Sequence, residues 1–192
     1  MKGTSTMMKI LERTQIGVMA LAAVLATSLI ATTTVAAEEQ TVNAFAAYEG
    51  EGKVYMTGEK KGTFVGAIVG ELFVESEKGP LHAGQIVCPA MMQLNLENGE
   101  QAGSGQCTIT AEDGAKIFAV WSCRGVHLIG CDGKMMLIGG TGRNAGVSGS
   151  GPLMVRSTSR GLVKTSSDKG SVTEFGSGVL VLNGFKYKKS SK

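Results

Sequence analysis

From residue 63 onward, hydrophobic residues come in short runs separated by turn residues, and no long stretch keeps the period of an amphipathic helix. Short apolar or alternating runs that are bounded by Gly, Asn, Asp and Pro are typical of β-strands. The pattern predicts strands over the following ranges: 63–74, 85–96, 103–110, 116–123, 134–138, 147–158, 161–165 and 172–182.

Short connections between consecutive strands indicate antiparallel neighbours. About eight to ten such strands either close into a barrel or split into a sandwich. Glycines within the runs, such as Gly66 and Gly70, favour the barrel because they allow strands to bend. We therefore predict an all-β domain, a single small antiparallel β-barrel of about eight strands. A membrane barrel is disfavoured because aromatic residues make up only 5% of the chain.

The N-terminal region has the pattern of a secretory signal peptide. Basic residues precede an apolar run over 16–30, and small residues follow it as far as Ala37. The run is shorter than the ~18–20 residues that a membrane-spanning helix needs. We predict a signal helix that is cleaved after Ala37, with Ala36 as the alternative, and hence a secreted or periplasmic protein. The predicted organisation is a signal peptide over 1–37, a barrel over 38–185 and a basic flexible tail over 186–192.

Cleavage changes the charge that the chain carries. Removal of residues 1–37 from the 192-residue chain leaves 155 residues, enough for one domain with its own core. It removes three basic residues and one acidic residue, which lowers the formal net charge from +3 to about +1. This balance gives little support to nucleic-acid binding. We predict no nucleic-acid partner and no stable membrane insertion.

All four cysteines follow the predicted cleavage site: Cys88, Cys107, Cys123 and Cys131. In an exported protein with an even number of cysteines, disulfides are the default interpretation, and four cysteines allow three pairings. We favour Cys88–Cys107 with Cys123–Cys131, because each pair brackets one predicted hairpin. The cysteines lack the close pairs of zinc sites, so we expect no metal, and we expect no other cofactor.

Asn98-Gly99 is the strongest hairpin dipeptide in the chain. As a two-residue loop it makes Cys88 and Cys107 diagonal neighbours on one face of the hairpin. A bulge near Pro89 would bring the two side chains together.

The sequence GGTGRNAGVSGSG, over 139–151, approaches the spacing of a dinucleotide-binding loop. Such loops lead into a helix whose N–H groups face the phosphates, but VSGSGP does not begin a helix. We interpret the motif as a strand-to-strand turn, in which glycines supply positive φ angles and close backbone approach. The predicted turn residues are Gly139, Gly140, Thr141, Gly142, Arg143, Asn144 and Gly146.

This motif resembles the GGTG-x-F-x-G-A-x-G turn of the allene oxide cyclase and dirigent-like barrel superfamily. The stretch from Cys88 to Arg156, which includes AVWSC, resembles the small exported bacterial members of unknown role. The resemblance implies a small antiparallel barrel, often with an apolar interior, and it carries no catalytic set to this chain. An aromatic residue that plugs the barrel end in the superfamily is replaced here by Asn144.

Several methionines and the only tryptophan lie in predicted strands, where they either fill a core or line a pocket. The candidates for lining a cavity are Met91, Met92, Trp121, Met135 and Met136. His82 follows a predicted turn and His127 lies in a predicted loop, and we expect both side chains to be in contact with solvent.

The sequence identifies no catalytic and no cofactor-binding residue. We predict a non-catalytic exported barrel that binds a small apolar molecule or acts as a structural or interaction module. The alternative is a cyclase- or isomerase-like enzyme working in the barrel mouth. That alternative requires at least two convergent polar side chains inside a cavity.

Overall fold

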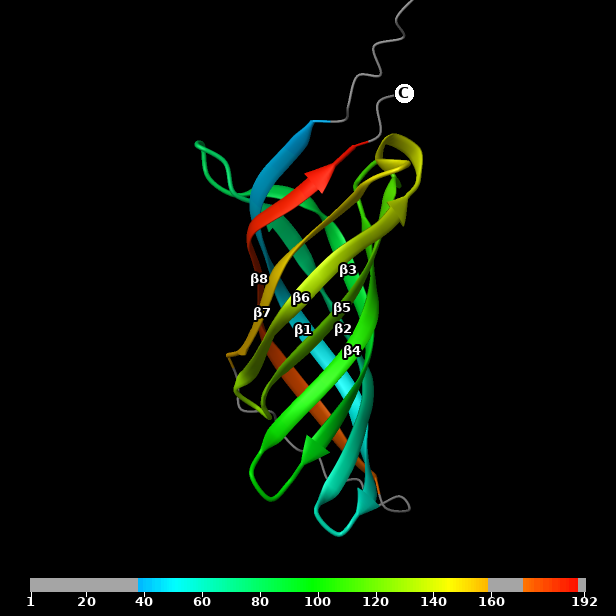
Figure 1. Ribbon diagram of the computed structural model, residues 1–192, viewed down its shortest axis with the longest axis vertical. Helices are drawn as coiled ribbons and strands as arrows, with labels where there is room; N and C mark the ends of the chain where they lie inside the picture. Colours follow the sequence, from blue (N-terminus) through cyan, green and yellow to red (C-terminus); the bar gives the residue numbers. More distant parts are fainter. Residues whose placement is uncertain (1–37, 159–170, 190–192) are drawn as a thin grey trace, which may run out of the picture. The chain divides into compact units, whose positions relative to one another are not determined.

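The computed structural model describes residues 38–158 and 171–189, which form a closed antiparallel barrel of eight strands (Figure 1). The predicted all-β barrel is confirmed. The strands are β1 (Glu39–Gly58), β2 (Lys61–Val74), β3 (Leu81–Asn95), β4 (Glu100–Thr110), β5 (Lys116–Val126), β6 (Gly130–Gly140), β7 (Ser148–Ser157) and β8 (Ser171–Lys188). In this part of the chain, no helix is long and apolar enough to cross a membrane.

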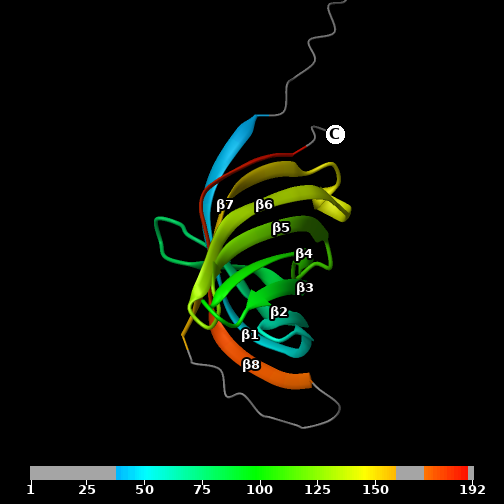
Figure 2. The same cartoon turned by 60° about the horizontal axis from the view of Figure 1, so that its bottom comes forward.

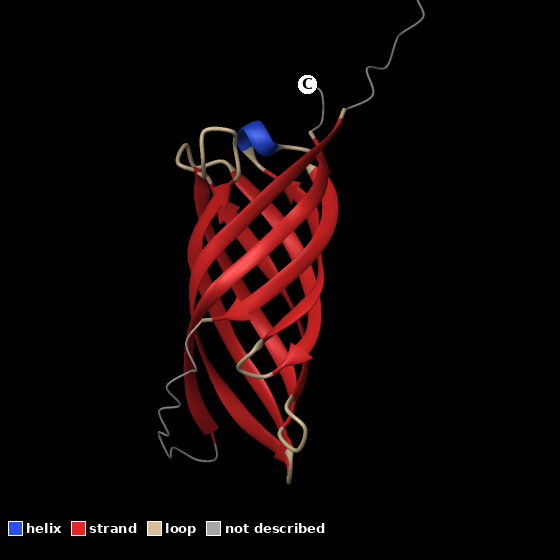
Figure 3. Cartoon of the chain, turned by 90° about the vertical axis from the view of Figure 1, so that its left-hand side faces the viewer, coloured by secondary structure: helices blue, strands red, loops and turns tan. Residues whose placement is uncertain are grey.

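Each strand pairs with its neighbours in the sequence, and β8 pairs with β1 to close the barrel. Figure 2 shows the consecutive strands side by side, with β8 next to β1. The strands run obliquely around the barrel (Figure 3), as closure of a sheet requires. The closing ladder extends from Glu39 opposite Lys188 to Tyr55 opposite Ser171.

Two elements differ from the sequence prediction. The first strand, β1, occupies a range in which no strand was predicted, because its inward positions are mostly Ala and Gly and give a weak apolar signal. At the other end of the chain, β8 continues to Lys188, so residues 186–188 of the predicted flexible tail are paired strand. The predicted strand at 161–165 and the predicted signal peptide at 1–37 lie outside the described residues.

Alternate residues of each strand point into the barrel, and the middle of the interior is tightly packed. Ile86, Cys88, Met135 and Leu180 are the largest side chains with less than 2% of their surface exposed. Ala46, which is also fully buried, allows these larger side chains of other strands to meet in the interior. The result is an apolar layer across the barrel.

Both predicted disulfides are present and buried inside the barrel. Cys88–Cys107 links β3 to β4, and Cys123–Cys131 links β5 to β6. The hairpin loop at 96–99 has four residues instead of the predicted two. The register is therefore different: Cys88 lies directly opposite Cys107 in a ladder without a register shift. The predicted bulge is neither present nor needed.

The glycine-rich motif connects β6 to β7. The strand β6 ends at Gly140, and a short 3-10 turn, η1 (Gly142–Asn144), precedes β7. Gly139, Gly142 and Gly146 have φ angles of +146°, +58° and +74°, a region of backbone conformation that favours glycine. A single 3-10 turn presents no helix N-terminus to a phosphate.

Candidate binding cavity

The barrel has two ends, which differ in the turns that they carry. One end, at the bottom of Figure 1, carries the β1–β2, β3–β4 and β5–β6 turns, and we call it the His127 end. The other end carries the β2–β3, β4–β5 and β6–β7 turns, and we call it the Asn144 end. Each end opens into a separate recess, and the two recesses share no lining residue.

The recess at the His127 end is a cavity of about 150 Å³. Its wall is mainly apolar, with contributions from Phe64, Ile68, Ala90, Met92, Leu153 and Leu180. A dry cavity of roughly this volume holds a molecule the size of benzene. The interior of the barrel is therefore packed in its middle but hollow at this end.

Six polar side chains also line this cavity: Tyr48, Gln101, Trp121, His127, Ser157 and Glu174. They come from five strands and one turn, and inward-facing positions near the strand ends bring them together. Polar groups that converge on an apolar cavity are typical of ligand sites.

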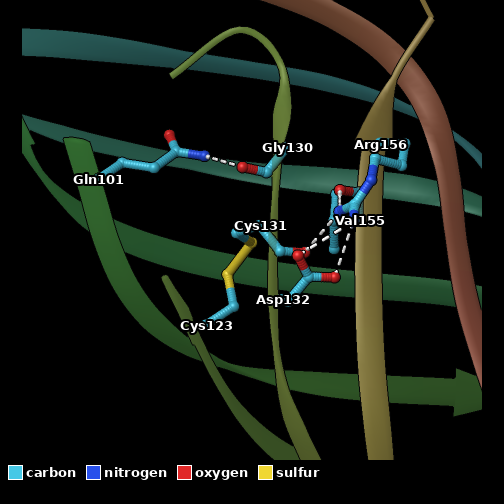
Figure 4. Close-up of polar contacts among 7 residues, drawn as sticks. All are labelled: Gln101, Cys123, Gly130, Cys131, Asp132, Val155 and Arg156. Carbon is cyan, nitrogen blue, oxygen red and sulfur yellow. Dashed lines mark hydrogen bonds and ion pairs between the residues drawn. A yellow bond between two sulfur atoms is a disulfide. The ribbon is translucent and has the colours of Figure 1, made fainter. Parts of the chain in front are cut away.

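His127 forms the centre of the polar wall. Its Nε2 lies 3.0 Å from Oε1 of Glu174, and the two side chains are only 18% and 15% exposed. Its Nδ1 lies 3.4 Å from Oε1 of Gln101, whose Nε2 donates to the Gly130 carbonyl at 3.2 Å (Figure 4). Both ring nitrogens thus lie within hydrogen-bond distance of side-chain oxygen atoms. The expectation that His127 is solvated is wrong.

Two sets of contacts, both drawn in Figure 4, hold the start of β6, the strand that follows the turn with His127. The Cys123–Cys131 disulfide closes the β5–β6 hairpin that carries this turn. On the next strand, Arg156 donates to the Cys131 carbonyl at 3.2 Å and to both carboxylate oxygens of Asp132, at 2.8 and 3.0 Å. The turn that presents His127 is therefore fixed to both β5 and β7.

Trp121 is the second notable group in the wall. Its Nε1 is buried and, within the described part of the chain, has no hydrogen-bond partner. The residue pairs with Gly105 on β4, where an added Cβ would lie only 2.9 Å from Nε1, so the indole packs directly on the glycine backbone. A buried N–H donor without a partner costs about 1–3 kcal/mol.

Tyr48 contributes a buried phenol from β1. Burial raises the pKa of Tyr48 above its ordinary value, and a hydrogen bond with Ser157 lowers it by a smaller amount. The phenol is therefore neutral at physiological pH and retains its O–H group.

The five candidate cavity residues occupy three different places. Met92 and Trp121 line the cavity at the His127 end, whereas Met135 is fully buried and lines the recess at the Asn144 end. Met91 and Met136 are not cavity residues, because they are 54% and 47% exposed on the outside of the barrel. Adjacent residues of a strand face opposite sides, so only one methionine of each pair can point inward.

Sequence reasoning missed the polar wall, although part of the information was present. Gln101, Tyr48 and Glu174 sit at inward positions of their strands. Strand alternation would have placed them once the strand boundaries were known. Among the described residues, no cluster of three His, Cys, Asp or Glu could hold a metal ion.

The sequence matches no known family profile and no curated protein. Among solved structures, the chain is similar to a pterocarpan synthase dirigent protein, GePTS1. The identity is 13%, the match covers 80% of this chain and 93% of that one, and the TM-score is 0.35. This likeness is too distant to assign a family or an activity to the chain.

Proposed function

We propose that the protein binds a small, largely apolar molecule that carries a hydrogen-bond acceptor, in the cavity at the His127 end. The observation that carries this proposal is that Trp121, whose buried Nε1 has no partner among the described residues, lines an apolar cavity. A ligand oxygen that accepts this hydrogen bond would recover part of the cost of burying the donor. The cavity volume of about 150 Å³ suits a six-membered ring with one polar group.

The proposal is tested by calorimetric titration with cyclohexanone, a compact ring with one carbonyl acceptor. Ala90 lines the cavity, so Ala90→Phe is expected to fill it and to abolish binding. Met91→Phe is the matched control, because the neighbouring side chain points outward. Binding that survives Ala90→Phe unchanged would place the ligand elsewhere and contradict the proposal.

A third variant covers the possibility that Ala90→Phe does not fold. Trp121→Phe keeps an aromatic ring but removes the N–H donor. It is expected to weaken cyclohexanone binding by roughly ten-fold, equivalent to one hydrogen bond of about 1.4 kcal/mol. Equal affinity for the wild type and Trp121→Phe would show that the indole N–H makes no contact with the ketone.

A second candidate function, an isomerase-like proton transfer, is favoured by the contact between His127 and Glu174. We propose that the Glu174 carboxylate would take a proton from the carbon next to a bound carbonyl group. The Trp121 N–H would stabilise the enolate oxygen, while the protonated Glu174 exchanges its proton with solvent and returns a solvent-derived proton to the carbon, which regenerates the carboxylate. In D₂O, cyclohexanone would then lose its α-proton signals faster with the wild type than with Glu174→Gln. Equal exchange rates for the wild type and Glu174→Gln would exclude this candidate. Glu51→Gln, at an exposed position, is the control and should exchange like the wild type.

We also propose that the barrel acts outside the cytoplasm, in the periplasm or the medium, after removal of residues 1–37. The signal-peptide pattern and the two disulfides support this proposal. The mass of the exported protein is expected to correspond to a chain that begins at Glu38. Recovery of a chain that retains the N-terminal 37 residues, in the cytoplasm only, would contradict it.

A further inference from the structure

The Asn144 end carries a second recess, of about 540 Å³. Its wall is built from buried aliphatic and aromatic side chains of five strands: Ala44, Leu72, Ile109, Leu137, Leu182 and Phe185. Met135, fully buried, also lines it and belongs to the packed middle of the barrel. This volume lies within the range of about 300–1,000 Å³ that is usual for small-molecule sites.

One polar residue stands out in this wall. Asn144, from η1, is only 7% exposed and is the buried polar residue of the described barrel. It lines the recess, and no other described residue forms a hydrogen bond with its side-chain amide. Among the described residues, Trp121 Nε1 is the one side-chain polar atom that is both fully buried and unpartnered, so the Asn144 amide is open to the recess and can meet a bound molecule. A bound molecule with both a donor and an acceptor would satisfy the Asn144 amide.

The charges around the opening are balanced. Arg143 Nε lies 3.1 Å from Asp113 Oδ2, and His82 lies between Glu71 and Glu112. Lys189 also borders the recess, but it is exposed to water. Neither sign of charge dominates, and an ionised group would lose its hydration on entering an apolar recess. These observations favour an uncharged head group.

We propose that the Asn144 end is a second binding site, for an aliphatic molecule with an uncharged carboxamide head. The aliphatic chain packs along the wall of the recess, where it removes apolar surface from water. The carboxamide pairs with the Asn144 amide, donor to acceptor in both directions. This site is independent of the cavity at the His127 end, since the two recesses share no lining residue.

Calorimetric titration with octanamide tests the proposal. Asn144→Leu keeps the approximate size of the side chain and removes both hydrogen-bonding groups. It is expected to weaken octanamide binding at least ten-fold relative to the wild type. Ala145→Leu is the matched control on the same turn, because Ala145 is exposed, and it should bind octanamide like the wild type.

A second variant and a second measurement complete the test. Asn144→Asp keeps the shape but introduces a charge, so it should also weaken binding, whether or not Asn144→Leu folds. The Ala90→Phe variant fills the other cavity and should leave octanamide affinity unchanged. The proposal is overturned if octanamide does not bind the wild type, if both Asn144 variants bind it normally, or if Ala90→Phe abolishes its binding. If cyclohexanone does not bind at the His127 end, the results expected for octanamide stay the same.

Discussion

At the scale of single residues, the interior of this barrel combines apolar packing with buried polar groups at its ends. Trp121, His127 and Tyr48 face one recess, and Asn144 faces the other. The Tyr48 phenol and the Trp121 Nε1 are buried away from water, so each either pairs within the protein or favours a ligand. Tyr48 is paired with Ser157, whereas the indole nitrogen of Trp121 has no partner among the described residues.

Tyr48→Phe is expected to lower the free energy of unfolding by about 0.5–1.5 kcal/mol, because it removes the hydrogen bond with Ser157. Urea unfolding would measure the difference. Tyr55→Phe, at an exposed position of the same strand, should have almost no effect and serves as the control.

The Tyr48 phenol is also expected to make the free energy of unfolding depend on pH. Because burial raises the pKa of Tyr48 in the folded state, the unfolded chain loses this proton at lower pH than the folded chain. The contribution of Tyr48 to stability is complete below about pH 10, the ordinary tyrosine value, and is lost as the pH rises through the folded pKa. A spectroscopic titration that showed all three tyrosines ionising together near pH 10 would contradict this assignment.

At the scale of elements, part of the structure followed from the sequence and part did not. The even cysteine count and the bracketed hairpins gave the correct disulfide pairing. The loop between β3 and β4 was predicted two residues too short, because Asn98-Gly99 looks like a complete turn when only local dipeptides are considered. The register depends on the whole ladder, which the dipeptide does not encode.

The candidate site was harder to predict than the fold. Strand alternation alone excludes one methionine of each adjacent pair, so Met91 and Met136 could have been rejected from the sequence. The contact between His127 and Glu174 could not have been predicted. It joins residues 47 positions apart, and it exists only because the barrel closes and brings β8 beside the β5–β6 turn.

His82 connects three elements at the Asn144 end. Its Nε2 lies 2.7 Å from Glu71 Oε2 on β2, and its Nδ1 lies 3.3 Å from Glu112 Oε1 in the β4–β5 turn. The hydrogen bond with Glu71, followed by that with Glu112, raises the pKa of His82 above its ordinary value.

Because the pKa of His82 is raised in the folded state, protonated His82 stabilises the fold. This stabilisation is fully present below about pH 6.5, the ordinary histidine value, and is lost as the pH rises through the folded pKa. The melting temperature of the wild type relative to His82→Gln should therefore fall between pH 6 and pH 8. A difference between the two proteins that stays constant over this range would contradict the assignment.

Loss of either disulfide is expected to lower the stability of the barrel by a similar amount. Cys88–Cys107 and Cys123–Cys131 close loops with sequence separations of 19 and 8 residues. From the entropy of loop closure, replacing either pair by alanine should lower the free energy of unfolding by about 3 kcal/mol, slightly more for the longer loop. Denaturant unfolding of the two double variants would measure this. A stability equal to that of the wild type in either variant would show that its loop is constrained without the disulfide.

At the scale of the whole barrel, the central arrangement is a packed middle layer between two recesses. Ile86, Met135 and Leu180 fill the layer, so each recess is closed at its inner end. Apolar walls with a few unpaired polar groups are a property of binding sites more than of a purely structural module. Of the two recesses, the cavity at the His127 end is the one that we propose receives an acceptor-bearing apolar molecule.

The most direct test is the nuclear magnetic resonance signal of the Trp121 indole N–H, which is unambiguous because the chain contains one tryptophan. Titration with cyclohexanone is expected to shift this resonance downfield and saturably, because the carbonyl oxygen accepts the N–H hydrogen bond. Methylcyclohexane, similar in size but without an acceptor, should cause a smaller change without the downfield displacement. An indole resonance that does not move with cyclohexanone, or that moves equally with both molecules, would contradict the claim.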